Sequence, residues 1–206
     1  MTVTEVRPGQ KNRRRFNVYV DEEFAFACFA DTLSRFDIRK GLQLTSEQIE
    51  EIKRTDEVQA AREYAFSYAS RGPKTEKQFR DKLRERGYGE ESRQAAIEML
   101  RGYGYIDDEA YARAYAEELF QANGRWAVNR KLRERGIARE IIEKVTAGAD
   151  SADALERQLD RLTERNARMD PEKAKARIIR SLAAKGFDFE DIRAAMERRR
   201  QMEEDE

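Results

Sequence analysis

The sequence predicts a mostly α-helical protein, an elongated array of three tandem three-helix repeats that follows a small N-terminal antiparallel β cap. The first observation is a repeated phrase. Lys-Leu-Arg-Glu-Arg-Gly occupies residues 82–87 and again 131–136, and a looser version ends at Gly186. The three glycines are 49 and 50 residues apart, a spacing typical of stacked helical units that share a core. The second observation is that the chain has only 3 prolines among 206 residues, which leaves long helices uninterrupted.

Each repeated phrase predicts the end of a helix. Cationic residues before the glycine suit the negative end of the helix dipole. A glycine just past the last turn allows the positive φ that this position needs. A large apolar residue then follows and can pack back on the helix end. We therefore expect Gly87, Gly136 and Gly186 to terminate the middle helix of each repeat with a left-handed backbone.

The N-terminal region, residues 1–55, predicts the β cap. Alternating apolar residues at 16–20 and 24–28 indicate two strands joined by a short turn at 21–23. An earlier strand near 2–6 ends at Arg7-Pro8-Gly9, a turn signal. A third strand is expected because a lone hairpin is marginally stable. A short helix near 31–36 follows, and Thr45 with Gln48 forms a capping box.

The remaining chain divides into repeats at 56–106, 107–150 and 151–202, followed by an acidic tail at 203–206. Helices are expected at 56–70, 75–86 and 90–102 in the first repeat. Asp107 or Asp108 begins the second repeat, Gly124 breaks its first helix, and Asp170-Pro171 begins a helix of the third. Apolar residues four positions apart predict one buried stripe on each middle helix. These pairs are Phe79 with Leu83, Val128 with Leu132, and Ile178 with Leu182.

Composition limits the possible classes of protein. The chain is 40% charged with 41 cationic and 41 anionic residues, and its mean hydropathy is −0.94. Its apolar residues recur at helical intervals, which argues against disorder. The single cysteine, Cys28, excludes an intramolecular disulfide and fits a reducing cytosol. Neither a membrane span nor a signal peptide is recognisable, so we expect a cytoplasmic protein, and we also expect it to be a monomer.

Catalytic chemistry is poorly represented. The chain has no histidine and one cysteine, which removes the common general base, the usual nucleophile pairs and a four-ligand zinc site. No phosphate-binding glycine loop occurs, and Gly102 and Gly104 lack the third glycine of a dinucleotide motif. The carboxylates of Asp107, Asp108 and Glu109 could hold a divalent ion, but anionic residues at the positive end of a helix dipole explain them better. We expect no enzyme activity, no cofactor and no metal.

Several stretches resemble the RecX family. One is the run from Arg71 to Tyr111, with Gly87 and Gly-Tyr-Gly-Tyr-Ile-Asp-Asp at 102–108. Another is Gly-Arg-Trp at 124–126, which leads into the second repeated phrase at 131–137. The N-terminal segments 15–21 and 30–33 resemble the extended form of the same family. The resemblance covers nearly the whole chain, although the third repeat lacks the Lys-Leu-Arg-Glu-Arg phrase.

The resemblance implies a function that composition and periodicity do not name. RecX proteins are bacterial regulators of the RecA recombinase. They are arrays of three-helix repeats that lodge in the groove of the RecA filament on DNA. They restrain ATP hydrolysis and strand exchange, and thereby tune DNA repair, recombination and the SOS response. Some members also bind single- or double-stranded DNA directly.

Cationic residues are the candidate contacts with DNA or with an acidic protein surface. A row of cations on the middle helix of each repeat would make a stripe suited to phosphates. A solvated face of mixed ion pairs is the competing explanation. The candidates are Arg13, Arg14 and Arg15 in the cap, Lys77, Arg80 and Arg84 in the first repeat, Arg125, Lys131 and Arg135 in the second, and Lys173, Arg177 and Arg180 in the third.

Two functions from different classes remain at this stage. The first is a non-enzymatic regulator that binds RecA or its filament. The alternative is a tandem helical DNA-binding or scaffolding protein with no recombinase partner. Trp126, the single tryptophan, is expected to pack in the core between repeats; stacking on a base or filling a partner's pocket is the other interpretation.

Overall fold

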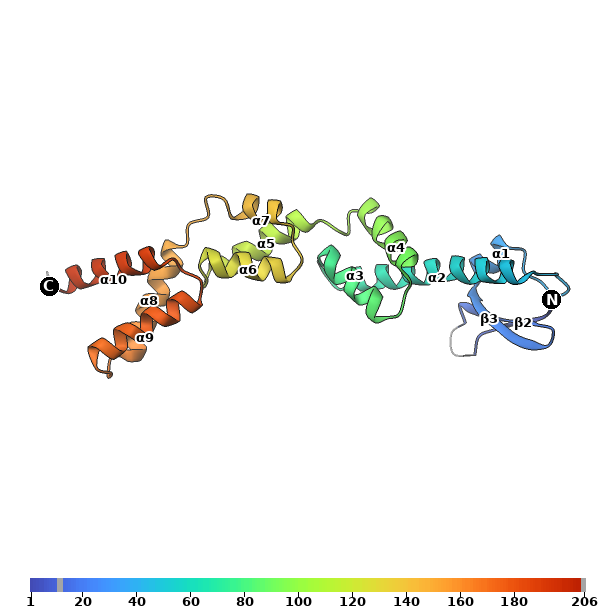
Figure 1. Cartoon of the computed structure of the whole chain (residues 1–206), viewed down its shortest axis with the longest axis horizontal. Helices are drawn as coiled ribbons and strands as arrows, with labels where there is room; N and C mark the ends of the chain where they lie inside the picture. The colour runs from blue at the N-terminus through green and yellow to red at the C-terminus, as the bar shows by residue number, and fades with distance from the viewer. Residues whose placement is uncertain (11–12, 205–206) are drawn as a thin grey trace. The chain divides into compact units, whose positions relative to one another are not determined.

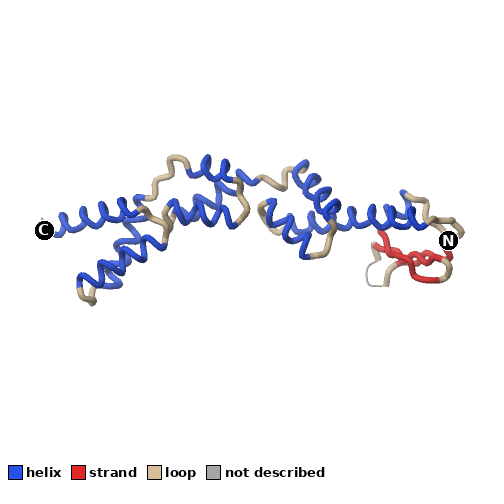
Figure 2. The backbone as a smooth tube through the Cα atoms, viewed as in Figure 1, coloured by secondary structure: helices blue, strands red, loops and turns tan. Residues whose placement is uncertain are grey.

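The computed structural model describes residues 1–10 and 13–204, and within them it contains three strands and ten helices. Figure 1 labels these elements and Figure 2 separates the strands from the helices. The predicted fold class is confirmed: a small antiparallel sheet precedes three three-helix repeats. The chain divides into two compact units, Met1–Pro73 with Phe79–Ile106, and Lys74–Gln78 with Asp107–Glu206.

The sheet of the first unit has the strand order β1-β2-β3, with antiparallel neighbours. Its strands are β1 (Val3–Pro8), β2 (Arg15–Val20) and β3 (Glu23–Phe29). The turn between β2 and β3 places Asp21 at φ 49° and Glu22 at φ 72°, the sign that a two-residue hairpin turn requires. One face of the sheet contributes Val18 and Cys28 to a buried core.

A buried carboxylate attaches this sheet to the first two helices, α1 (Ala30–Arg35) and α2 (Ser46–Ala69). Asp56 of α2 accepts hydrogen bonds from the Phe29 backbone N–H (2.7 Å), the Thr32 hydroxyl (3.0 Å) and the Arg15 guanidinium (2.6 Å). Since an unpaired buried charge is costly, these three donors make the position of Asp56 stable.

Helix α2 contributes buried side chains to two hydrophobic cores. It begins at the expected Thr45 and Gln48 capping box, so the helix expected to start near residue 56 starts ten residues earlier, and the expected boundary between 55 and 56 lies inside it. No glycine or proline interrupts 46–69. Ile52 belongs to the core of the cap, whereas Ala61 and Ala65 belong to the core of the first repeat.

The first repeat combines the second half of α2 with α3 (Glu76–Glu85) and α4 (Glu90–Gly102). Phe79 and Leu83 of α3 are buried, as the four-residue spacing predicts, and they pack with Ile97 and Leu100 of α4. Small alanines on α2 let α4 approach closely. The core therefore lies where the three helices meet.

The second unit contains two further three-helix repeats with separate cores. The second repeat has α5 (Asp108–Phe120), α6 (Arg125–Glu134) and α7 (Arg139–Thr146), around Val128 and Leu132. The third has α8 (Ala152–Asn166), α9 (Pro171–Ala184) and α10 (Phe189–Glu204), around Ile178 and Leu182. Helix α10 continues into the expected acidic tail, of which 205–206 lie outside the described residues.

The predicted helix-ending glycines are confirmed. Gly87, Gly136 and Gly186 have φ values of 84°, 82° and 81°, the left-handed region in which a side chain is strained. Gly136 and Gly186 also lie where successive middle helices meet inside the second unit, next to Lys77 and Ala127 respectively. The Gly124 N–H at the start of α6 donates to the Lys185 carbonyl at the end of α9 (3.0 Å).

The start of α3 forms a similar hydrogen-bonded contact with the end of α6, also within the second unit. The Thr75 hydroxyl donates to the Arg135 carbonyl (2.7 Å) while it also caps α3 together with Gln78. In both contacts the carbonyls at one helix end meet the donors at the next helix start, so the helix dipoles are favourably aligned. In the described residues, 1–10 and 13–204, every helix is too short or too polar to span a lipid bilayer.

Candidate binding surface

The cationic row predicted on α3 is present but partly neutralised. Lys77 is exposed, and its aliphatic stem lies against Gly136. Arg80 donates to the Gln94 amide oxygen (2.8 Å) and lies 3.8 Å from a Glu90 carboxylate oxygen. Arg84 pairs with Asp81 at 2.7 Å. This row is therefore a mixed face of cations and carboxylates.

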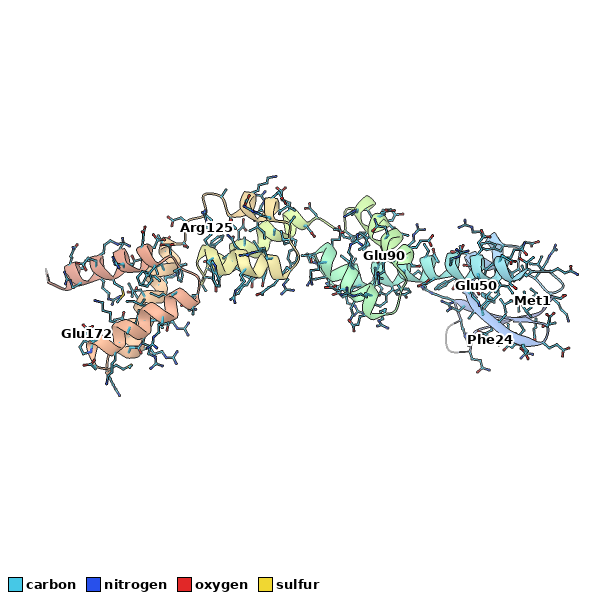
Figure 3. All side chains as sticks on the ribbon, viewed as in Figure 1. Met1, Phe24, Glu50, Glu90, Arg125 and Glu172 are labelled. Carbon is cyan, nitrogen blue, oxygen red and sulfur yellow. The ribbon has the colours of Figure 1, made fainter. Side chains whose placement is uncertain are left out.

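The triple expected on α6 does not form a row, which corrects the sequence interpretation. Arg125, labelled in Figure 3, lies at the first turn of α6 and donates to the Thr146 carbonyl (2.6 Å). Arg135 lies at the other end, 5.3 Å from the ring of Tyr115, whose hydrogen bond raises the pKa of this guanidinium. The physical reason is helical geometry. A spacing of six residues turns Arg125 about 120° away from Lys131 around the axis.

A different face of α6 is exposed. Trp126 is 59% exposed, Arg130 lies 5.2 Å from its ring centroid, and Arg133 is exposed one turn further on. The expectation that Trp126 packs in the core is wrong, because Ala127 and Val128 take the buried positions at this turn. The spacing of these three residues by four and three was available in the sequence and predicts a shared face.

The row predicted on α9 is the most exposed of the three. Lys173, Arg177 and Arg180 all face solvent, and their spacing by four and three places them on one side of the helix. Arg177 contacts the Met169 sulfur (3.6 Å) and Arg180 donates to the Ala176 carbonyl (3.2 Å). None of the three forms an ion pair with another described residue.

Sequence reasoning missed a second cationic row in the same repeat. Arg161 and Arg165 of α8 and Arg168, just after it, are exposed and have the same spacing of four and three. This spacing is visible in the sequence and predicts the shared face.

The three arginines of the cap have different roles. Arg13 and Arg14 are exposed before β2. Arg15 instead donates to Asp56 and to the Ala27 carbonyl, and its guanidinium lies 4.7 Å from the Phe29 ring centroid. Its charge is matched inside the protein, so we assign it to the fold rather than to a partner.

The acidic residues at the start of α5 form hydrogen bonds and ion pairs with other groups of the same chain. Asp107 accepts from the Ala110 N–H (2.8 Å) and Asp108 from the Glu76 N–H (2.9 Å). Glu109 pairs with Lys144 (2.7 Å), and this hydrogen bond is the main reason that the pKa of Glu109 is lowered. In the described part of the chain, no three acidic or thiol side chains are grouped to hold a metal ion.

Comparison with known protein families explains this arrangement of repeats. A family model described as the regulatory protein RecX N-terminal domain matches residues 1–45. The first, second and third three-helix domains of RecX match 61–100, 107–145 and 149–196. The chain belongs to the RecX family. Four family domains thus follow one another along most of its length.

Individual RecX relatives and solved structures agree with this assignment. The chain is 31% identical over 195 residues to a regulatory protein RecX of Clostridium perfringens strain SM101, covering 91% of each chain. It is 32% identical over 197 residues to that of Caldanaerobacter subterraneus, covering 95% of this chain and 98% of the relative.

Two crystal structures have the same fold. One of regulatory protein RecX has a TM-score of 0.72 at 25% identity and covers 95% of this chain and 98% of the other. One of RecX from Lactobacillus salivarius has a TM-score of 0.63 at 22% identity, over 70% of this chain and 97% of the other.

The surface of this RecX-family chain offers binding chemistry on several separate elements. Exposed cations lie on α8 and α9, and an exposed tryptophan with two arginines lies on α6. Such groups can contact phosphates, carboxylates and planar rings. They are suited to holding an extended partner by many contacts.

Proposed function

We propose that this chain is a non-enzymatic regulator that binds the RecA recombinase, or its filament on DNA, and inhibits its ATP hydrolysis and strand exchange. The observation that carries the proposal is the succession of all four RecX domains along the chain. Membership of a family of regulatory proteins supports it. The repeated helical units suit a repetitive partner, since several weak contacts on linked units add to a strong one.

The α9 row (Lys173, Arg177 and Arg180) is the part of the surface that we assign first to partner binding. These three cations are exposed and lack carboxylate partners among the described residues. In contrast to the mixed face of α3, this row keeps its charge for a phosphate or an acidic surface. Figure 3 labels Glu172, which lies on the first turn of the same helix.

The experiment measures RecA ATP hydrolysis on single-stranded DNA with and without the full chain. We expect inhibition. Sub-stoichiometric inhibition would indicate that filament growth is capped, and near-stoichiometric inhibition would indicate binding along the filament groove. A chain that leaves RecA unaffected but binds DNA would support the alternative function, a DNA-binding or scaffolding protein, and contradict the proposal.

The triple substitution Lys173→Gln, Arg177→Gln and Arg180→Gln tests the α9 row. We expect at least tenfold weaker inhibition with little change in the melting midpoint, since exposed charges each contribute only about 0–1 kcal/mol to stability. The matched control is Arg161→Gln, Arg165→Gln and Arg168→Gln, which removes the same charge at the same spacing in the same repeat. Equal losses in both triples would contradict a specific role of the α9 row.

A further inference from the structure

An open pocket with a volume of about 810 Å³ lies inside the second unit, where α6 begins, α9 ends and α10 begins. Two aromatic side chains in its lining are exposed, Trp126 by 59% and Phe189 by 55%. Single exposed apolar side chains are common on protein surfaces, whereas several in one place mark a binding site. The two rings therefore make this pocket a candidate for recognising a flat or apolar group.

Backbone contacts hold both rings at one helix junction. The Trp126 N–H donates to the Gly186 carbonyl (3.2 Å), next to the hydrogen bond between Gly124 and Lys185. Phe189 follows Gly186 by three residues and begins α10. The backbone that carries both rings is therefore ordered before a ligand arrives, which lowers the entropy lost on binding.

The charged lining of the pocket is mainly anionic. The carboxylates of Asp150, Asp188 and Asp191 line it, against the single guanidinium of Arg125. Asp150 and Asp188 each accept one backbone N–H through one oxygen, at 2.8 and 2.9 Å. None of the three carboxylates forms an ion pair with another described residue. The pocket can therefore attract a cation and accept hydrogen bonds from it.

A buried acceptor adds to this preference. The amide oxygen Oδ1 of Asn129, which also lines the pocket, is buried and has no hydrogen-bond partner among the described residues. An unsatisfied buried acceptor costs free energy, so a ligand that donates hydrogen bonds here is favoured. Because phosphates are acceptors and are repelled by carboxylates, the lining disfavours nucleic acid and favours a cation with several N–H donors.

We propose that this pocket binds an arginine side chain of a partner protein, with its guanidinium against the rings of Trp126 and Phe189 and hydrogen-bonded to Asp188 and Asp191. A guanidinium is planar, stacks on aromatic faces and donates to carboxylates as a fork, whereas a lysine ammonium has neither the plane nor the fork. Arg130 makes the first kind of contact within the chain. Its guanidinium lies 5.2 Å from the Trp126 ring centroid, although it does not line the pocket.

The lining favours a protein as the source of this arginine. Tryptophan, tyrosine and arginine side chains dominate the binding energy of protein interfaces, and an open pocket admits a side chain that is attached to a backbone. The inference goes beyond the proposed function, because it assigns a pocket and a recognition chemistry without requiring that the partner is RecA.

The experiment titrates the full chain, without RecA, with the peptide acetyl-Gly-Gly-Arg-Gly-Gly-amide. Trp126 is the single tryptophan, so its fluorescence reports directly on the pocket. We expect a saturable change in emission, and at least about tenfold weaker binding when citrulline, a neutral isostere, replaces arginine. A lysine peptide should also bind more weakly, because it lacks the planar fork. Since no RecA is present, failure of this site and failure of RecA inhibition are distinguishable.

Substitutions in the pocket test its two kinds of contact. Phe189→Ala should weaken binding about 2- to 30-fold. The double substitution Asp188→Asn and Asp191→Asn should weaken it at least about fivefold, and asparagine can still accept the backbone hydrogen bond that Asp188 accepts. The matched control is Asp153→Asn with Glu190→Gln, which removes two exposed carboxylates on the first turns of α8 and α10 that lie outside the pocket.

Two further variants separate the pocket from its surroundings. Phe24→Ala removes a ring on β3 that is 59% exposed and lies outside the pocket, and it should bind normally. Arg130→Gln removes the chain's own cation beside Trp126 and should leave the affinity unchanged or higher. The melting midpoint of each variant shows whether it is folded.

Several results would overturn the proposal. They are no binding of the arginine peptide, equal affinity for the citrulline peptide, unchanged affinity in the pocket variants, equal losses in the controls, or weaker binding by Arg130→Gln. Stronger binding of spermidine than of the arginine peptide would identify a site for free polyamines in its place.

Discussion

At the scale of single residues, Cys28 is a clear case of burial that determines chemistry. The thiol is fully buried in the core of the cap. Burial, together with the nearby carboxylate of Asp56, raises its pKa from 9.0 to about 12. The native state therefore keeps the thiol protonated at pH values where the unfolded chain ionises it, and this makes the cysteine poorly reactive.

This pKa predicts a loss of stability in alkaline solution. Between pH 9 and 12 the native state holds a proton that the unfolded state has released, so the free energy of unfolding falls as the pH rises. Cys28→Ala should lower stability at neutral pH but flatten this alkaline decline. Urea unfolding of both proteins at pH 7 and above pH 9 measures the two slopes.

Tyrosines and lysines also titrate in this range, so the difference between the two proteins is the informative quantity. Parallel declines would show that Cys28 ionises in the native protein as it does in the unfolded chain. Rapid labelling of the folded protein by a thiol reagent would contradict the burial directly.

At the scale of elements, the helix-ending glycines separate backbone strain from packing. All three have nearly the same positive φ. A Cβ at Gly87 would meet no atom within 4 Å, whereas one at Gly136 would overlap Lys77, including its Cβ, which moves only with the backbone. A Cβ at Gly186 would overlap the backbone of Ala127, which cannot move aside easily.

Alanine at the three positions should therefore destabilise by different amounts. Gly87→Ala should cost about 1–2 kcal/mol from the left-handed backbone alone. Gly136→Ala and Gly186→Ala should each cost more than this, at least about 3 kcal/mol for Gly186→Ala, because they add overpacking against Lys77 and against the Ala127 backbone to the same strain. Chemical denaturation of the three variants gives the order.

Gly102 provides the control, since it lies at the end of α4 without a positive φ and a Cβ there meets nothing within 4 Å. Gly102→Ala should leave the protein as stable or slightly more stable. Equal costs at Gly87 and Gly186 would show that the contact between α6 and α9 adds nothing to the requirement for glycine.

The elements also show what sequence patterns can predict. Local signals such as the Thr45 and Thr75 capping boxes and the glycine stops depend on neighbouring residues, and they were predicted correctly. Trp126 was misplaced because burial at the start of α6 depends on Gly186, which is 60 residues away along the chain. The hydrogen bonds that Asp56 of α2 accepts from the cap were not predicted for the same reason, since only the fold brings α2 and the cap together.

At the scale of the whole molecule, stability is distributed over several cores. The cap, the first repeat, the second repeat and the third repeat each have their own buried cluster. The cap and the first repeat share α2, and the later repeats meet through helix ends. In such arrays the free energy of unfolding is approximately a sum of unit stabilities and terms between neighbours.

Local destabilisation should therefore stay local. Leu182→Ala removes a fully buried side chain from the third repeat, at a cost of about 2–5 kcal/mol. Native-state hydrogen exchange should show faster exchange in α8, α9 and α10, while β2, β3 and α2 keep their protection. Ile52→Ala, in the core of the cap, should give the reverse pattern. Because each variant serves as the other's control, uniform acceleration across the chain in both would show that the cores unfold as one cooperative unit.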